Sequence, residues 1–169
     1  MKRLELFVYG TLKSDQFNFS RFLEGAYDDL QPAKTRGYLF RLGGRIPIFA
    51  PYELVLKHRP ELIQQAFRVG CDGWVQGEYF LIKPSYSKNL LENLDRLEGY
   101  IPQSPWNTYE RSLIDVTLQD KQVKKVFTYA TPQNRLHNFN RLIIGGEYIG
   151  NCKESEIEID EFENQNFQG

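Results

Sequence analysis

The stretch that decides the fold is Phe7-Val8-Tyr9-Gly10-Thr11-Leu12-Lys13, near the start of a 169-residue chain. The apolar run over residues 6–9 predicts a short buried strand over residues 4–9, and Gly10 ends it because glycine permits a sharp bend. In such a turn the backbone amides of Gly10, Thr11 and Leu12 can point to a common spot. Clustered N–H groups bind a carboxylate or an oxyanion without a charged side chain. A strand that ends in glycine is more often just a turn, so this stretch alone does not establish an anion site.

A second informative stretch is Leu94-Asp95-Arg96-Leu97-Glu98-Gly99-Tyr100, at the end of a predicted helix over residues 84–97. Glu98 follows Leu94 by four residues, so it falls on the apolar face of that helix. Desolvation there raises the pKa of a carboxyl group, and the helix C-terminus disfavours negative charge. Both effects favour a general acid/base that works near neutral pH. If the helix ends one residue earlier, Glu98 is instead an exposed terminal residue.

Together the two stretches resemble the gamma-glutamylcyclotransferase-like family. Its members carry a Tyr-Gly-Thr-Leu turn after the first strand and a Leu-Asp-x-x-Glu-Gly segment that presents the catalytic glutamate. Over residues 4–150 further similar stretches follow in the family's order: Gly37-Tyr38-Leu39-Phe40, Ile46-Pro47, Val75-Gln76-Gly77-Glu78-Tyr79-Phe80, Tyr109-Glu110-Arg111 and Phe127-Thr128-Tyr129-Ala130. Two features depart from the pattern. The family's late Gly-Asp-Trp is Gly146-Glu147-Tyr148 here, and residues 51–70 resemble an insertion.

The resemblance implies an α+β fold, a small mixed β-barrel with flanking helices, over residues 1–150. It implies an enzyme without metal or cofactor that cyclises a gamma-glutamyl amine or peptide to 5-oxoproline and releases the amine. Glu98 is the implied catalytic acid/base, and the form of the turn is closer to the branch that acts on gamma-glutamylamines. The implied substrate-binding residues are Tyr9, Gly10, Thr11, Leu12, Tyr109 and Tyr129. We therefore expect the Glu98 carboxylate to share a cavity with the amides of residues 10–12.

Two alternatives to this function stay open. A non-catalytic module that binds a small molecule or a protein could keep the same barrel. A biosynthetic enzyme could instead remove a gamma-glutamyl protecting group. The sequence names neither the amine half of the substrate nor the oligomeric state. We expect residues 51–70 and other loops to read the amine half.

Two further acidic residues have structural interpretations. Asp95, on the flank of the apolar stripe, is expected to be solvated or to form an ion pair with Arg96 or Arg111. Glu78, inside a predicted strand, is expected to be exposed or to make structural hydrogen bonds. Neither is expected to be a catalyst.

Composition and charge are those of a folded protein, with 41% hydrophobic and 14% aromatic residues. A net charge of −1 argues against nucleic acid as the main partner, because phosphate binding needs a concentrated basic face. Cys71 and Cys152 lie far apart without a metal-ligand spacing, which favours a reduced, cytoplasmic setting. The apolar run behind Met1-Lys2-Arg3 is too short for a signal peptide, and no stretch approaches the length of a membrane span.

Many short strands and few helices favour a mixed barrel over a βαβ array. The predicted strands cover residues 4–9, 35–42, 45–50, 73–82, 113–118 and 122–131; the predicted helices cover 60–67 and 84–97, with a short one within 14–24. Residues 151–169 hold six acidic residues and one lysine, which predicts a solvated tail without a role in folding or catalysis. The alternative for this tail is that Ile157 and Ile159 form an edge strand.

Overall fold

The computed structural model describes residues 3–43, 46–150 and 156–159. Its centre is a closed barrel of five strands: β1 (Glu5–Val8), β2 (Tyr27–Leu42), β4 (Trp74–Ile82), β5 (Glu110–Leu118) and β6 (Val123–Ala130). The order around the barrel is β2-β4-β1-β6-β5 and back to β2. β1 and β6 are parallel, and the other four pairings of the barrel are antiparallel. The predicted small mixed barrel is confirmed.

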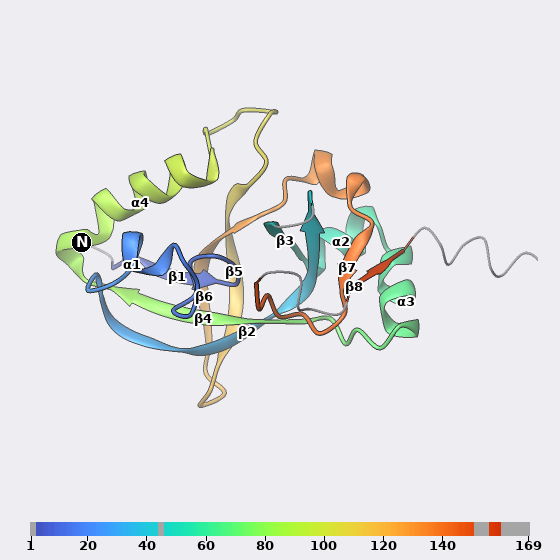
Figure 1. The fold of residues 1–169 in the computed structure, drawn as a ribbon, viewed down its shortest axis with the longest axis horizontal. Coiled ribbons are helices and arrows are strands. Elements are labelled where there is room, and N and C mark those ends of the chain that lie inside the picture. The colour runs from blue at the N-terminus through green and yellow to red at the C-terminus, as the bar shows by residue number, and fades with distance from the viewer. Residues whose placement is uncertain (1–2, 44–45, 151–155, 160–169) are drawn as a thin grey trace, which may run out of the picture.

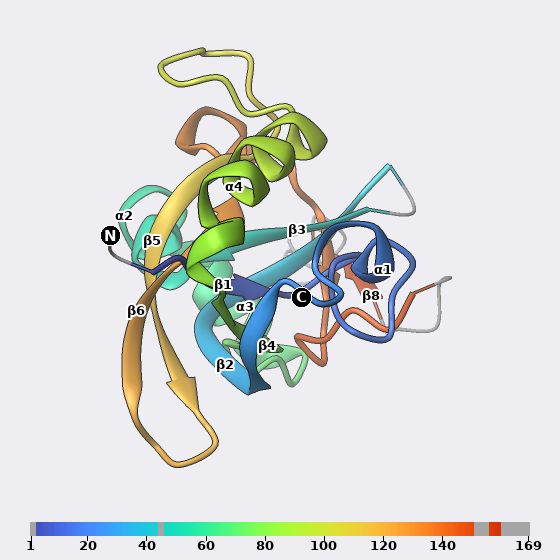
Figure 2. The same ribbon diagram turned by 90° about the vertical axis from the view of Figure 1, so that its left-hand side faces the viewer.

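The long strand β2 continues past the barrel into a second group of strands. Its last residues pair with β3 (Ile46–Pro51) and with β7 (Arg141–Ile143), and β8 (Glu156–Glu158) pairs with β7. The helices are α1 (Phe19–Phe22), α2 (Tyr52–His58), α3 (Glu61–Arg68), α4 (Pro84–Glu98) and the 3₁₀ helix η1 (Gln133–Asn138). Figure 1 shows α4 at one end of the molecule and α2 and α3 at the other, and Figure 2 views the molecule from the end at which α4 lies.

Strand β1 is buried on both faces, which explains its continuous apolar sequence. Leu6 and Val8 belong to one apolar cluster, which also contains Leu94 of α4. Phe7 lies between them in the chain and belongs to a second cluster with Val126 of β6. This alternation follows from the two-residue period of a strand. The end of β1 and the helix α4 are thereby packed against each other.

The segment at residues 51–70 contains two helices, of which the sequence predicted one. Pro60 precedes α3, in line with the prediction. The helix α2 was missed because it is short and buries a single residue, Val55, so its apolar pattern is weak.

The acidic tail departs from its expected solvated state at residues 156–159. Ile159 is buried, and Glu156 of β8 lies 2.7 Å from Arg41 and 3.1 Å from Arg141. Acidic residues alternate with isoleucines there, so the apolar side chains share one face while arginines neutralise an acid on the other. The expectation of a solvated tail is wrong for this stretch. The alternative of an edge strand is confirmed for Ile157, which lies in β8, whereas Ile159 follows the strand as a buried turn residue. The remaining tail residues, 151–155 and 160–169, lie outside the described residues.

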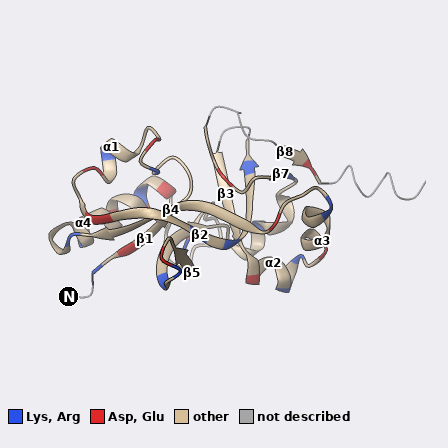
Figure 3. Ribbon diagram, turned by 90° about the horizontal axis from the view of Figure 1, so that it is seen from below, with Lys and Arg blue, Asp and Glu red and all other residues tan. Residues whose placement is uncertain are grey.

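Charged residues are scattered over the elements in the view of Figure 3, with acidic and basic positions interspersed. In the part of the chain that the structure describes, no helix combines the length and the apolar character needed to cross a membrane.

Candidate active site

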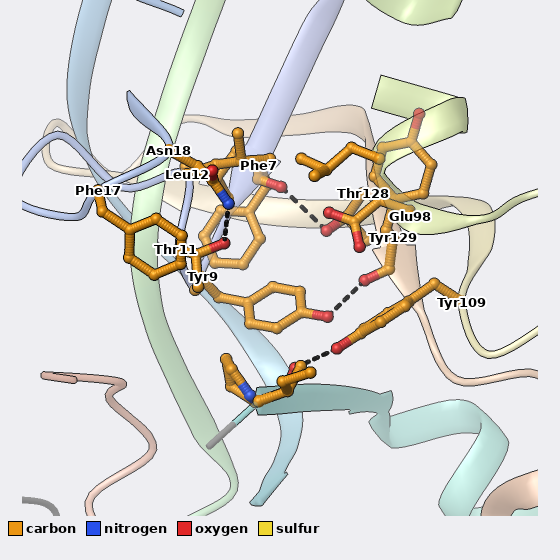
Figure 4. Close-up of a pocket in the computed structure, with 15 residues that line it drawn as sticks. Phe7, Tyr9, Thr11, Leu12, Phe17, Asn18, Glu98, Tyr109, Thr128 and Tyr129 are labelled. Atoms are coloured by element: carbon orange, nitrogen blue, oxygen red, sulfur yellow. Dashed lines mark hydrogen bonds between the residues drawn. The ribbon is translucent and has the colours of Figure 1, made fainter. Parts of the chain in front are cut away.

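A pocket of about 230 Å³ lies between the end of β1 and the end of α4 (Figure 4). The structure brings together around it all the residues that the sequence assigned to a site: Tyr9, Gly10, Thr11, Leu12, Glu98, Tyr109 and Tyr129. The other residues of its wall are Phe7, Val8, Phe17, Asn18, Ile46, Pro47, Leu97 and Thr128. The expected cavity shared by Glu98 and the turn at residues 10–12 is present. The roles of these residues in binding and catalysis stay predictions.

The turn after β1 is held by hydrogen bonds within its own segment. The Lys13 amide donates to the carbonyl of Gly10 at 3.1 Å, and the Asn18 amide donates to the carbonyl of Thr11 at 3.0 Å. The Asn18 side chain also donates to Thr11 Oγ1 at 3.0 Å. Gly10 has no left-handed backbone angle; instead, a Cβ atom at this position would lie 2.8 Å from Pro47 Cγ. Glycine is therefore needed here because the turn packs closely against Pro47.

The backbone amides of the turn remain available to a ligand. Within the described residues, the N–H groups of Gly10, Thr11 and Leu12 donate to no protein acceptor. All three residues line the pocket. Adjacent free amides can bind a carboxylate or a developing oxyanion.

Glu98 is the last residue of α4, and Gly99 caps the helix. Gly99 has φ 65°, and the Tyr100 amide donates to the carbonyl of Asp95 at 2.8 Å. This is the left-handed ending that glycine permits. The helix thus includes Glu98, and the alternative of an earlier end is wrong.

The Glu98 carboxylate is half-buried in the pocket wall and makes no hydrogen bond or ion pair with the described residues. Burial raises the pKa of Glu98 from its ordinary 4.5 to about 7. An unpaired carboxyl group with this pKa exchanges protons readily near neutral pH.

Asp95 lies one helical turn before Glu98 and has two partners. The Tyr129 hydroxyl donates to Asp95 Oδ1 at 2.6 Å, and Arg111 Nη1 donates to Asp95 Oδ2 at 2.9 Å. The predicted ion pair with Arg111 is confirmed. These contacts tie the last turn of α4 to β5 and β6, and so fix where the helix presents Glu98.

The three tyrosines of the pocket use their hydroxyl protons within the protein. Tyr9 donates to the carbonyl of Tyr129 at 2.6 Å, and Tyr109 donates to the carbonyl of Pro47 at 2.8 Å. Tyr129 donates to Asp95. Burial raises the pKa of each of the three hydroxyls, with a second contribution from Asp95 at Tyr129. All three stay neutral near pH 7 and serve as walls of the pocket.

The pocket lies within a stretch of the chain that matches a known family. A family model described as gamma-glutamyl cyclotransferase, AIG2-like, matches residues 6–150. The chain belongs to this family. It is accordingly an enzyme of the gamma-glutamyl cyclotransferase kind. No curated protein matches the chain in sequence.

Solved structures with the cyclotransferase fold are similar at low sequence identity. The glutathione-specific gamma-glutamyl cyclotransferase from yeast has a TM-score of 0.56 and 14% identity, over 78% of this chain and 69% of that one. An AIG2-like protein from Mus musculus has a TM-score of 0.53 and 22% identity, over 79% and 80%. YkqA from Bacillus subtilis has a TM-score of 0.54 and 20% identity over 87% of this chain, which spans 40% of that protein. These likenesses show the shared fold.

Two further expectations, one about residues 51–70 and one about Glu78, have outcomes in the structure. No residue of the 51–70 segment lines the pocket, so the prediction that this insertion reads the amine half is wrong. The helices α2 and α3 lie at the opposite end of the molecule from α4, which is the physical reason (Figure 1). Glu78 accepts hydrogen bonds from the amide and the hydroxyl of Ser14, at 2.6 and 2.7 Å, as its structural interpretation predicted.

Sequence reasoning missed Phe17, Ile46 and Leu97 as pocket residues. Ile46 was visible in the Ile46-Pro47 match, but nothing in that match pointed to a site. Phe17 follows the turn at residues 10–12 closely in the chain, and Leu97 precedes Glu98. Nearness to these two motifs was the signal that could have found them.

Proposed function

We propose that this protein is a gamma-glutamylcyclotransferase that converts a gamma-glutamylamine to 5-oxoproline and the free amine. One observation carries the proposal: the Glu98 carboxyl group shares a pocket with three backbone amides, and neither it nor they have a hydrogen-bond partner among the described residues, while burial raises the pKa of Glu98 to about 7. We place the reaction in the cytoplasm, with the free thiol of Cys71 as support.

The first step is proton removal from the α-ammonium group of the glutamyl moiety by ionised Glu98. The freed amine attacks the γ-carbonyl carbon of the same molecule and closes a five-membered ring. Because nucleophile and electrophile belong to one molecule, the enzyme has mainly to fold the substrate and to move protons. The oxyanion that develops on the γ-carbonyl oxygen accepts hydrogen bonds from the amides of Gly10, Thr11 and Leu12.

The second step breaks the bond between the γ-carbon and the leaving amine. Protonated Glu98 returns its proton to the leaving nitrogen, and the tetrahedral intermediate collapses. Glu98, ionised again, takes the second proton of the ring nitrogen and passes it to the released amine, so the carboxylate ends the cycle as it began. The products are 5-oxoproline and the protonated amine. A carboxyl group with a pKa near 7 suits both directions of transfer, since neither protonation state is strongly favoured at neutral pH.

The test is release of 5-oxoproline from a panel of gamma-glutamyl amines, gamma-glutamyl amino acids and glutathione. We expect turnover of the amines by the full chain and its loss in Glu98→Gln. Absence of 5-oxoproline from every member of the panel would overturn the proposed function. Turnover of glutathione alone would overturn the choice of gamma-glutamylamines.

A further inference from the structure

Three large apolar side chains surround the opening of the pocket. Phe17 is 72% exposed, Ile46 is 50% exposed and Leu97 is 36% exposed, and all three line the pocket. They come from separate segments: the loop between β1 and α1, the start of β3 and the last turn of α4. Exposed apolar groups that gather around a cavity mark a surface that contacts another molecule. Because these three side chains form the rim of the pocket, the molecule that they contact is expected to be the one that enters the pocket.

The distribution of charge around the pocket also favours an apolar leaving group. Among the described residues that line the pocket, Glu98 is the only one with a charged side chain. A leaving group with a free carboxylate would lose part of its water against Phe17, Ile46 and Leu97, and no described residue of the lining supplies a cation in its place. Desolvating a charge without a partner is strongly unfavourable. An apolar leaving group would gain from the same contact.

The arrangement assigns the two halves of a substrate to different parts of the pocket. The γ-carbonyl has to lie between the amides of residues 10–12 and the carboxylate of Glu98. In Figure 4, Phe17 lies beside Thr11 and Asn18, and Glu98 lies on the other side of the pocket with Tyr129. The amine half therefore extends from the reacting carbon toward the opening, where the apolar rim receives it.

We propose that the amine released by this enzyme is apolar, an alkyl or arylalkyl amine without a carboxylate, and that Phe17 determines this preference. The proposal rests on the gamma-glutamylcyclotransferase function proposed above. It adds the chemical class of the leaving amine and assigns Phe17 a role that is separate from the chemistry of Glu98.

The experiment measures kcat/KM for 5-oxoproline release from gamma-glutamyl benzylamide, gamma-glutamyl methylamide and gamma-glutamylglycine. The full-length protein should prefer the benzylamide over gamma-glutamylglycine by about tenfold or more, the scale of discrimination by an apolar pocket. Phe17→Ala should lower kcat/KM for the benzylamide about tenfold more than kcat/KM for the methylamide, because a methyl group offers the rim far less apolar surface than a benzyl group. Phe17→Arg should raise kcat/KM for gamma-glutamylglycine relative to kcat/KM for the benzylamide.

Phe67→Ala is the matched control, since Phe67 is 78% exposed on α3 and does not line the pocket. It should leave all three substrates unchanged, and melting temperatures should show that every variant is folded. Equal loss of benzylamide and methylamide in Phe17→Ala, or a wild-type preference for gamma-glutamylglycine, overturns the apolar-amine proposal while the cyclotransferase function stands. No 5-oxoproline from any substrate overturns the function, and this proposal with it.

Discussion

The pocket and the sheet edge at β8 each contain a glutamate at the end of an element or near it, and the two residues differ in their partners. Glu156 of β8 pairs with Arg41, whose side chain is almost fully buried, and with Arg141. Glu98 of α4 pairs with no described residue, and its pKa is about 7. A paired carboxylate joins two strands, whereas an unpaired one costs stability and keeps its proton mobile. The sheet edge at β8 is thus held by ion pairs, whereas the pocket contains the carboxyl group to which the function proposed above assigns proton transfer.

The largest expected effect is on turnover at Glu98. Glu98→Gln keeps the size of the side chain and removes its proton exchange, so kcat should fall at least ~10²-fold, the scale of general acid–base catalysis. The measurement is 5-oxoproline release, with circular dichroism to check the fold. Near-normal turnover in this variant would remove Glu98 from the mechanism. Glu156→Gln is the control at the other region and should keep its turnover.

The second effect is on stability at the sheet edge. A chain truncated after Gly150 lacks β8, its ion pair with Arg41 and the buried Ile159. The free energy of unfolding should fall by at least ~2 kcal/mol, about the contribution of one buried isoleucine side chain. Turnover by the molecules that remain folded should be unaffected, because no residue of β8 lines the pocket.

Urea unfolding of the truncated and full-length proteins, with turnover measured well below the melting temperature, distinguishes the two regions. Unchanged stability would return the tail to its original interpretation as a solvated segment. Loss of turnover in folded molecules would contradict the separation of the two regions.

The sequence predicted the features that local patterns define and missed those that depend on contacts between distant segments. The turn at residues 10–12 and the helix that ends at Glu98 were found because local patterns define them: an apolar run that stops at glycine, and a stripe at helical spacing. The small mixed barrel was implied by a resemblance that covers most of the chain, although the number of its strands was not. The position of Glu98 in a shared cavity was expected from the same two motifs.

The missed features depend on contacts between distant parts of the chain. The strand β8 looks like a charged tail until Arg41, 115 residues earlier, supplies a partner for Glu156. The pocket rim needs three separate segments to meet, which no local pattern encodes. The need for glycine at position 10 comes from Pro47, and not from the backbone angle that the turn suggested.

The third effect concerns Asp95, which positions Glu98 without touching the pocket. Asp95→Ala removes the acceptor of both Tyr129 and Arg111, so the last turn of α4 loses its attachment to β5 and β6. We expect kcat to fall about tenfold, since small displacements of a catalytic group are costly. Asp95→Asn retains an oxygen that can accept from Tyr129 and should have a milder effect. Equal kcat in the alanine variant and the wild type would show that α4 is held by packing alone.

The smallest expected effect is a pH-dependent difference in stability at Glu98. Its pKa of about 7 in the folded protein exceeds the ordinary 4.5, so the folded state binds the proton more tightly than the unfolded state. Wild type should therefore lose stability relative to Glu98→Gln as the pH rises from 4.5 through 7. One pKa unit corresponds to ~1.4 kcal/mol, and solvent access to the half-buried carboxylate reduces the total, so we expect about 1 kcal/mol at pH 8. Urea unfolding between about pH 4.5 and 8 measures it, with Glu92→Gln, at an exposed glutamate of the same helix, as the matched control. If the difference between wild type and Glu98→Gln stayed constant over this range, the pocket would not perturb Glu98, and the contrast with Glu156 would lose its electrostatic basis.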